Sequence, residues 1–289
     1  MQTVSLPRTR LAVGLTIHGD LTAGPPVIAL HGFPDTSFSL HPLAAGLTAA
    51  GHPTVTPNLR GYAPTGVPVN GDVTLRTLAQ DVIELMDALG LPRVSLIGHD
   101  WGSVIAFCAA NLAPERIERL VLLSVPPPRL FLRNVPRAPG QLVRSRYMAQ
   151  FQVPRWSEAM VRRDDFAFVE TLWRRWSPGF EPPPERLAEV RAALTPPGAL
   201  TTALSYYRGL RSPRNWWTAA PLAFARPVQP TIVLTGARDA CIAPEMFRGL
   251  AQAFLGPFDF REIPGAGHFL PCEAPEALLA AIVPFLNAC

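Results

Sequence analysis

The chain has 289 residues, of which 48% are hydrophobic and 17% charged, and its net charge is +4. This length and balance are typical of a globular protein with a large core and exclude a disordered chain. No apolar run approaches the ~20 residues that a membrane-spanning helix needs. The first residues also lack the apolar stretch of a signal peptide. We therefore expect a cytoplasmic protein that has no membrane partner.

The N-terminal part of the chain alternates strand-like and helix-like segments. Loose alternation of apolar residues predicts an edge strand at 11–18, and a continuous apolar run predicts a buried strand at 26–30. The other elements predicted before residue 125 are a helix at 40–50, a strand at 54–56, a helix at 75–89, and strands at 94–97 and 119–124. This alternation favours a doubly wound parallel sheet of the α/β class.

The alternation stops at Pro126-Pro127-Pro128, and no buried strand is predicted again before residue 230. Helical periodicity instead predicts helices at 141–152, 155–163, 166–176, 185–194 and 199–210. Five of the six tryptophans lie in this stretch: Trp156, Trp173, Trp176, Trp216 and Trp217. We therefore predict a helical lid (cap) at residues 126–229, inserted into a core domain formed by 1–125 and 230–289. Such a lid would line an apolar pocket; the alternative is that most of its tryptophans fill only its own core.

The predicted sheet resumes after the lid. The elements expected there are a strand at 231–236, a helix at 244–254, a strand at 258–263 and a terminal helix at 275–286. Arginines outnumber acidic residues in the lid, which could attract nucleic acid. They alternate with aromatic residues and prolines, however, and no basic run is longer than two residues, as in a solvated helical surface. We expect no nucleic-acid partner.

The segment Gly98-His99-Asp100-Trp101-Gly102 follows a strand-like run and precedes a helix-like one. That layout is typical of a nucleophile elbow, a strained turn that lifts one side chain above the end of a sheet. The raised residue would be Asp100, whose carboxylate can attack carbon and form an ester. The alternative is an ordinary glycine-rich turn in which Asp100 only caps the next helix.

A second loop, His31-Gly32-Phe33-Pro34, follows the predicted strand at 26–30. Glycine and proline on either side of Phe33 favour an irregular loop that aims its backbone N–H into the crevice where open α/β sheets place their sites. A plain strand-to-helix turn would use the same two residues. We interpret His31 as structural rather than catalytic.

Three residues stand in the order nucleophile, acid, base: Asp100, Asp239 and His268. Each lies just beyond the C-terminal end of a predicted strand, where such a fold gathers its site. An ester on Asp100 persists unless water is activated beside it. His268 can take the proton of that water, and Asp239 can orient the imidazole. The backbone N–H groups of Phe33 and Trp101 would stabilise the resulting oxyanion.

These motifs resemble those of the α/β-hydrolase superfamily over nearly the whole chain, and within it the epoxide hydrolase and haloalkane dehalogenase branch. The resemblance implies a mostly parallel eight-stranded sheet with helices on both faces and an inserted helical lid. The stretch 98–102 is similar to the aspartate elbow of both groups, and 31–34 is similar to the epoxide hydrolase oxyanion loop. Dehalogenases usually carry Asn or Glu where Phe33 stands. The acid and base loops are similar to 236–239 and 265–269.

Epoxide hydrolases carry two lid tyrosines whose hydroxyls bind the oxirane oxygen. The setting of Tyr147 is similar to that of the first tyrosine, and Ser205-Tyr206-Tyr207-Arg208 is similar to that of the second. We assign Tyr147 and Tyr207, because Tyr206 points to another face of the helix. A phenol stays protonated at neutral pH and can donate a proton to the alkoxide that ring opening forms. The alternative is that these tyrosines only pack the lid.

The resemblance implies an epoxide hydrolase that converts an apolar epoxide and water to a vicinal diol without a cofactor. We expect Phe33, Trp101, Phe151 and Phe269 to line its pocket, and the enzyme to be a monomer or homodimer. No metal is expected, because the four cysteines lack zinc-site spacing. Cys241 and Cys272 lie near Asp239 and His268 in sequence, which leaves open whether they pair.

Two other functions fit the same residues. The first is a haloalkane dehalogenase that uses Asp100 as nucleophile and the Trp101 indole as halide donor. The second is a non-catalytic small-molecule binding protein of the same fold. The complete set of Asp100, Asp239 and His268 argues against the second alternative.

Overall fold

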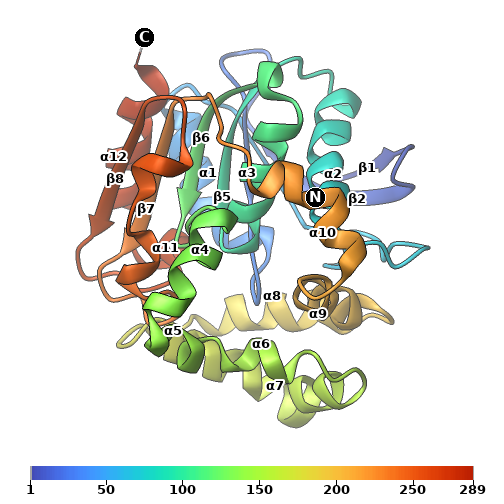
Figure 1. The fold of residues 1–289 in the computed structure, drawn as a ribbon. Helices are drawn as coiled ribbons and strands as arrows, with labels where there is room; N and C mark the ends of the chain where they lie inside the picture. The colour runs from blue at the N-terminus through green and yellow to red at the C-terminus, as the bar shows by residue number, and fades with distance from the viewer. Residues whose placement is uncertain (1, 289) are drawn as a thin grey trace.

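The computed structural model describes residues 2–288, apart from the side chain of Trp216, and has an eight-stranded sheet at its centre (Figure 1). Its order is β1-β2-β4-β3-β5-β6-β7-β8, with antiparallel pairing of β1 with β2 and of β2 with β4, and parallel pairing elsewhere. The strands are β1 Gln2–Leu6, β2 Leu11–His18, β3 Val27–Leu30, β4 Thr54–Pro57, β5 Val94–His99, β6 Ile117–Leu123, β7 Thr231–Gly236 and β8 Phe258–Ile263. The mostly parallel, eight-stranded sheet is confirmed.

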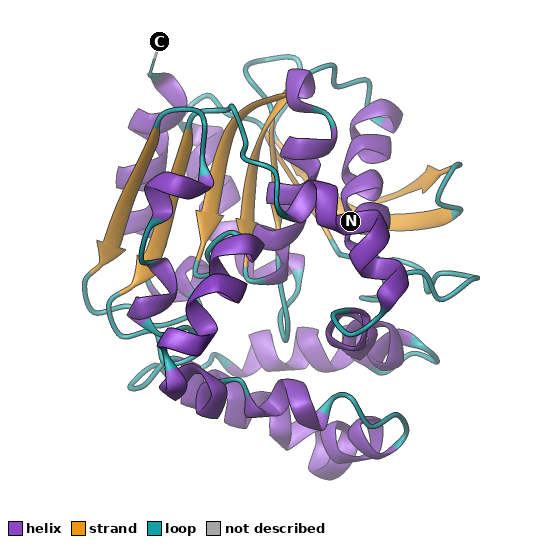
Figure 2. Cartoon of the chain, in the orientation of Figure 1, coloured by secondary structure: helices purple, strands orange, loops and turns teal. Residues whose placement is uncertain are grey.

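Helices cover both faces of this sheet (Figures 1 and 2). Alternate residues of the central strands enter two separate cores, because successive side chains of a strand point to opposite faces. One core holds α2 (Leu75–Ala88) and α3 (Trp101–Leu112). The other holds α1 (His41–Ala49) and the terminal helix α12 (Pro275–Asn287), with α11 (Leu270–Glu273) before it. In the described helices no apolar stretch is long enough to cross a membrane.

Between β6 and β7 the chain forms helices joined by loops, with no strand among the described residues. Helices α5 to α9 lie beyond the C-terminal ends of the strands (Figure 2). The helices are α4 Pro128–Asn134, α5 Pro139–Arg144, α6 Arg146–Gln150, α7 Trp156–Trp176, α8 Pro184–Leu194, α9 Ala199–Gly209 and α10 Pro213–Ala223. Helix α10 packs against α2 and α3 of the core. Non-helical backbone angles at Arg163, Asp164, Asp165 and Phe166 interrupt α7 where the sequence separates two helical windows.

Several predicted elements need correction. Strand 11–18 is not at the edge, because the exposed strand β1 pairs with it. The predicted helix at 141–152 is two short helices that meet at Ser145, and α4 and α10 are additional. The predicted helix at 244–254 was wrong. Two 3₁₀ turns form there instead, Pro244–Phe247 and Leu250–Ala253, because Arg248 is extended and Gly249 has a positive φ of 82°.

Candidate active site

Asp100 lies on a sharp turn between β5 and α3, as the elbow motif predicts. Its backbone angles, φ 52° and ψ −117°, are ones that a residue with a side chain rarely adopts. The two flanking positions require glycine, because backbone carbonyl groups lie where a side chain would begin. A Cβ on Gly98 would lie 2.2 Å from the carbonyl oxygen of Gly102, and one on Gly102 would lie 2.3 Å from that of Leu30. The Asp100 side chain makes no capping hydrogen bond to α3, so the simple capping alternative was wrong.

The structure brings together the three residues predicted to act as nucleophile, acid and base. Nδ1 of His268 donates to Oδ2 of Asp239 over 2.9 Å, and its Nε2 lies 3.6 Å from Oδ2 of Asp100. The other carboxylate oxygen of Asp239 accepts from the backbone N–H groups of Cys241 (2.7 Å) and Ile242 (2.8 Å). Asp239 therefore has a fixed orientation, and His268 bridges the two carboxylates.

His268 is fully buried, and its pKa depends on this bridge. Burial alone lowers the pKa of an imidazole, but the charges and hydrogen bonds of Asp239 and Asp100 outweigh burial and raise the pKa of His268 to about 10. The resting site is thus an imidazolium held between two carboxylates. Loss of the negative charge on Asp100 would remove part of that stabilisation and lower the pKa.

The oxyanion loop also contacts Asp100. The backbone N–H of Phe33 donates to Oδ1 of Asp100 over 2.8 Å, and a Cβ on Gly32 would lie 2.3 Å from that oxygen. Trp101 is the first residue of α3, so its N–H has no partner within the helix. Oδ1 therefore sits at a backbone donor, and Oδ2 lies toward His268.

His31 holds the oxyanion loop in place, as its structural interpretation predicts. Its Nε2 accepts from the N–H of Leu59 over 2.9 Å, and its Nδ1 donates to the carbonyl oxygen of Gly32 over 2.9 Å. Burial lowers the pKa of His31 to about 4, so the ring stays neutral and can accept at Nε2.

The two assigned tyrosines pack against each other in the wall of the cavity that Asp100 also lines. Tyr147 comes from α6 and Tyr207 from α9, and their ring centroids are 5.6 Å apart. Burial raises the pKa of both phenols well above the usual value, which keeps them protonated. The hydroxyl of the neighbouring Tyr206 instead donates to the carbonyl oxygen of Arg60 over 2.8 Å. The Tyr207 hydroxyl is buried and has no hydrogen-bond partner within the described part of the chain.

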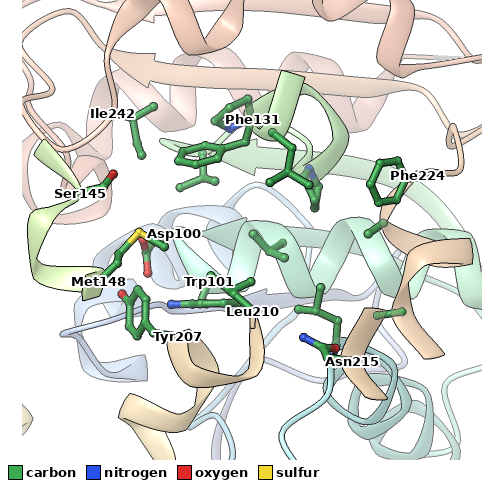
Figure 3. Close-up of a pocket in the computed structure, with 18 of the residues that line it drawn as sticks. Asp100, Trp101, Phe131, Ser145, Met148, Tyr207, Leu210, Asn215, Phe224 and Ile242 are labelled. Carbon is green, nitrogen blue, oxygen red and sulfur yellow. The ribbon is translucent and has the colours of Figure 1, made fainter. Parts of the chain in front are cut away.

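A cavity of about 210 Å³ opens onto Asp100 and both tyrosines (Figure 3). Its wall is largely apolar and combines the core with the segment between β6 and β7. The lining residues are Leu75, Asp100, Trp101, Val104, Val125, Pro126, Pro128, Phe131, Leu132, Ser145, Tyr147, Met148, Tyr207, Leu210, Asn215, Ala219, Ala220, Ala223, Phe224 and Ile242. In Figure 3 Asp100 and Met148 lie at one end, and Asn215 and Phe224 lie toward the other.

Of the four predicted pocket residues, Trp101 lines this cavity, but Phe33, Phe151 and Phe269 do not and are fully buried behind its wall. Phe33 and Phe151 pack edge-to-face against each other, with ring centroids 5.3 Å apart. Phe269 stacks on Trp173.

The described tryptophan side chains of the segment between β6 and β7 do not line the pocket either. Trp173 and Trp176 are buried but do not line the cavity, and Trp156 and Trp217 are exposed. The side chain of Trp216 lies outside the described residues. Cys241 and Cys272 are free thiols, so no disulfide joins them.

Two residues that hold the base loop were missed by the sequence analysis as site residues. The carbonyl oxygen of His268 accepts from Nε2 of His99 over 2.8 Å and from the hydroxyl of Ser124 over 2.7 Å. Burial lowers the pKa of His99 to about 4, so it acts as a neutral donor. His99 lies beside the elbow, and Ser124 follows the end of β6. Their shared partner is a backbone atom far along the chain, and the spacing of residues in the sequence does not reveal such a contact.

Residues 25–275 match the family described as alpha/beta hydrolase fold. The chain belongs to this α/β-hydrolase family. It is 30% identical to human Epoxide hydrolase 4, over 91% of this chain and 72% of that protein. It is 29% identical to Epoxide hydrolase A of Mycobacterium tuberculosis, over 91% of this chain and 90% of that protein. Among solved structures, a putative epoxide hydrolase from Klebsiella pneumoniae superposes on this α/β-hydrolase with a TM-score of 0.85 at 28% identity, covering 99% and 97% of the two chains.

Proposed function

We propose that this α/β-hydrolase opens an apolar epoxide and hydrolyses it to a vicinal diol. The observation that carries the proposal is the position of the Asp100 carboxylate. Oδ1 accepts the Phe33 N–H, while Oδ2 lies 3.6 Å from His268. The same residue lines a cavity that holds two buried, protonated phenols. The names of its relatives support the same activity.

In the first half-reaction, Oδ2 of Asp100 attacks a carbon of the epoxide and the carbon–oxygen bond of the ring breaks. The oxygen that leaves becomes an alkoxide and takes a proton from Tyr147 or Tyr207. The product is a hydroxyalkyl ester of Asp100, and the attacked carboxylate loses its charge. The pKa of His268 then falls, and the proton that His268 gives up balances the one lost by the tyrosine.

In the second half-reaction, neutral His268 takes a proton from water as the water oxygen bonds to the ester carbonyl carbon. The oxyanion that forms is Oδ1, which already accepts the N–H of Phe33; the N–H of Trp101, which has no partner within its helix, is the second proposed donor. Collapse breaks the ester bond, and the departing alkoxide takes the proton from His268. The remaining proton of the added water passes from the Asp100 carboxyl to His268, which restores the carboxylate and the protonated imidazole. The diol leaves, and Asp100 keeps one oxygen from water.

The cavity suggests the substrate class. Its 210 Å³ exceeds the roughly 150 Å³ apolar cavity that binds benzene but is smaller than the ~300 Å³ of drug-sized sites. Asp100 lies toward one end of it (Figure 3), so one substituent of the epoxide has room and a second large one does not. We infer a terminal epoxide with one aryl or short alkyl substituent. Residues 126–229 act in this scheme as the lid that excludes bulk water.

The dehalogenase alternative is less well supported. Trp101 lines the cavity, and its indole N–H is one candidate donor to a halide. The residue whose backbone N–H binds Asp100 is Phe33, and its side chain has no group that could donate a second hydrogen bond to the halide. Two buried phenols suit a leaving alkoxide, whereas a halide leaves without a proton.

A substrate screen tests the proposal directly. Purified enzyme is incubated with terminal aryl and alkyl epoxides and with haloalkanes of matched size, and diol and halide are measured. We expect diol from the epoxides and no halide. Halide release at a rate equal to or above diol release would favour the dehalogenase, and binding without any turnover would favour the non-catalytic protein.

A further inference from the structure

The last turn of helix α7 contacts all three loops that carry the site. Nε1 of Trp173 donates to the carbonyl oxygen of Pro34 in the oxyanion loop over 2.8 Å. The carbonyl oxygen of Trp176 accepts from the N–H of Ala240, beside Asp239, over 3.0 Å. Ser177, which ends the helix, accepts the N–H of His268 at its hydroxyl oxygen over 2.9 Å. One turn therefore holds the oxyanion, acid and base loops relative to one another.

Ser177 is fully buried, and together with Glu273 it binds backbone N–H groups of the base loop. Its hydroxyl donates to Oε1 of Glu273 over 2.5 Å. The same carboxylate accepts from the backbone N–H groups of Gly267 (2.6 Å) and Phe269 (2.8 Å). Two side chains thus bind three successive amides of the base loop. Ser177 alone accepts the middle one, that of His268, and it shares the N–H of Phe269 with Glu273, over 3.3 Å.

The peptide groups around His268 are held from two sides. His99 and Ser124 of the core bind its carbonyl oxygen, and Ser177 at the end of α7 binds its N–H. The imidazole must meet Asp239 and Asp100 at once, at 2.9 Å and 3.6 Å. Displacement of a catalytic group by about 1 Å can cost on the order of 10²-fold in rate. The Ser177 hydrogen bond therefore bears on catalysis although Ser177 touches no substrate.

We propose that Ser177 is a positioning residue, through which helix α7 sets the place of His268 and so the rate of ester hydrolysis. The proposal rests on the role given to His268 in the proposed function. It predicts a selective effect, because His268 acts on water in the second half-reaction and not on the epoxide in the first.

The packing around Ser177 makes alanine the informative substitution. A Cβ on Gly267 would lie 2.6 Å from Cα of Ser177, so a larger side chain at 177 has little room. Trp173 stacks on Phe269 with ring centroids 3.7 Å apart and planes at 6°, and this contact does not involve the Ser177 hydroxyl. Helix α7 therefore keeps a large apolar contact with the base loop in Ser177→Ala.

The control is Ser157→Ala. Ser157 is also a fully buried serine of α7, and its hydroxyl donates to the carbonyl oxygen of Val153 over 2.8 Å and accepts from Arg208. It contacts none of the three site loops through an interaction that the structure describes. Glu273→Gln supplies a second test variant, because it weakens the same ties to the base loop while keeping its size.

The first measurement is a single turnover of a terminal aryl epoxide with excess enzyme. We expect Ser177→Ala to leave the rate of ester formation unchanged, to slow ester hydrolysis about 10- to 100-fold, and to lower kcat and KM together as the ester accumulates. Glu273→Gln should act in the same direction, and Ser157→Ala should leave the ratio of the two rates unchanged. Equal slowing of both steps in Ser177→Ala, or none, would overturn the proposal.

The second measurement does not depend on turnover. NMR titration of the His268 imidazole in the resting enzyme should show a lower pKa in Ser177→Ala than in the parent, because the ring is held less well between Asp100 and Asp239. The other titratable group beside this ring, His99, is neutral. An unchanged titration would contradict the role of Ser177. If the parent forms no ester at all, the proposed function fails, and this titration still decides whether Ser177 positions His268.

Discussion

At the scale of single residues, the site depends on one carboxylate whose two oxygens have different surroundings. Oδ1 of Asp100 accepts a backbone N–H, and Oδ2 lies toward an imidazolium. The strained backbone turn places Asp100 where its two oxygens meet these different groups. The charge of Asp100 is one of the two that raise the pKa of His268. In the proposed mechanism, esterification of Asp100 therefore also prepares His268 to act as the base in the second step.

The charge on His268 leads to a prediction about stability and pH. The pKa of His268 is about 10 in the folded protein and near 6.5 in the unfolded chain. Its contribution to the free energy of unfolding is therefore complete below pH ~6.5, decreases between pH ~6.5 and ~10, and is lost above that. Chemical denaturation of parent and His268→Gln should show a stability difference that shrinks as pH rises through this window. A difference that grows with pH would contradict the imidazolium.

The two phenols lead to a prediction about the first half-reaction. Tyr147→Phe or Tyr207→Phe should each slow formation of the Asp100 ester partially, because the other hydroxyl remains. The double variant should lose most of the roughly 10²–10⁴-fold that a positioned proton donor contributes. Stopped-flow single turnovers measure this rate. Tyr206→Phe is the control, because the hydroxyl of Tyr206 binds the carbonyl oxygen of Arg60 and not the cavity. Ring opening at the parental rate in the double variant would refute the assignment.

The sequence predicts Asp100, Asp239 and His268 because each follows a predicted strand, and the C-terminal ends of parallel strands lie at one edge of the sheet. Ser177, His99 and Ser124 escape such prediction, since each binds a backbone group brought close only by the tertiary fold. The prediction that Phe33, Phe151 and Phe269 line the pocket was wrong for a similar reason. Aromatic character predicts burial, but it does not say which side of a wall a ring packs against.

At the scale of elements, strands and amphipathic helices of the core follow from apolar periodicity, while the errors lie where periodicity is weak. Strand β1 is mostly exposed and carries no apolar run. Helix α10 begins with Pro213 and contains Pro221, so local propensity disfavours a helix that tertiary packing against α2 and α3 stabilises. Gly249, with its positive φ, favours two separate turns over the helix predicted at 244–254.

Helix α10 determines the size of substrate in this account. Ala219, Ala220 and Ala223 line the cavity, and their small side chains leave the space that a substituent would fill. Ala220→Leu should raise KM for a terminal aryl epoxide while turnover of a small alkyl epoxide is retained. The measurement is kcat/KM for both substrates, with Trp217→Leu, on the exposed side of the same helix, as control. Equal loss on both substrates would place the substituent elsewhere.

At the scale of the whole molecule, the fold brings distant segments to one edge of the sheet. Gly98 pairs with Leu30, and Leu123 pairs with both His99 and Leu234. The oxyanion loop and the elbow therefore follow neighbouring strands, and the acid loop begins at the same edge, one strand further along. The helices inserted between β6 and β7 lie over this edge and supply both tyrosines. In the proposed mechanism, the nucleophile and the base therefore come from loops that follow strands of the sheet, and the proton donors come from the helices that cover it.

The central claim is that Asp100 attacks the epoxide itself, and isotope transfer tests it most directly. A single turnover with excess enzyme in ¹⁸O-water, followed by mass spectrometry of the diol and of the peptide that carries Asp100, shows where the water oxygen goes. Covalent attack predicts mostly unlabelled diol and label in Asp100, because water adds to the ester carbonyl carbon. Labelled diol from the first turnover, with no label in Asp100, would show that water attacks the epoxide directly and would contradict the account.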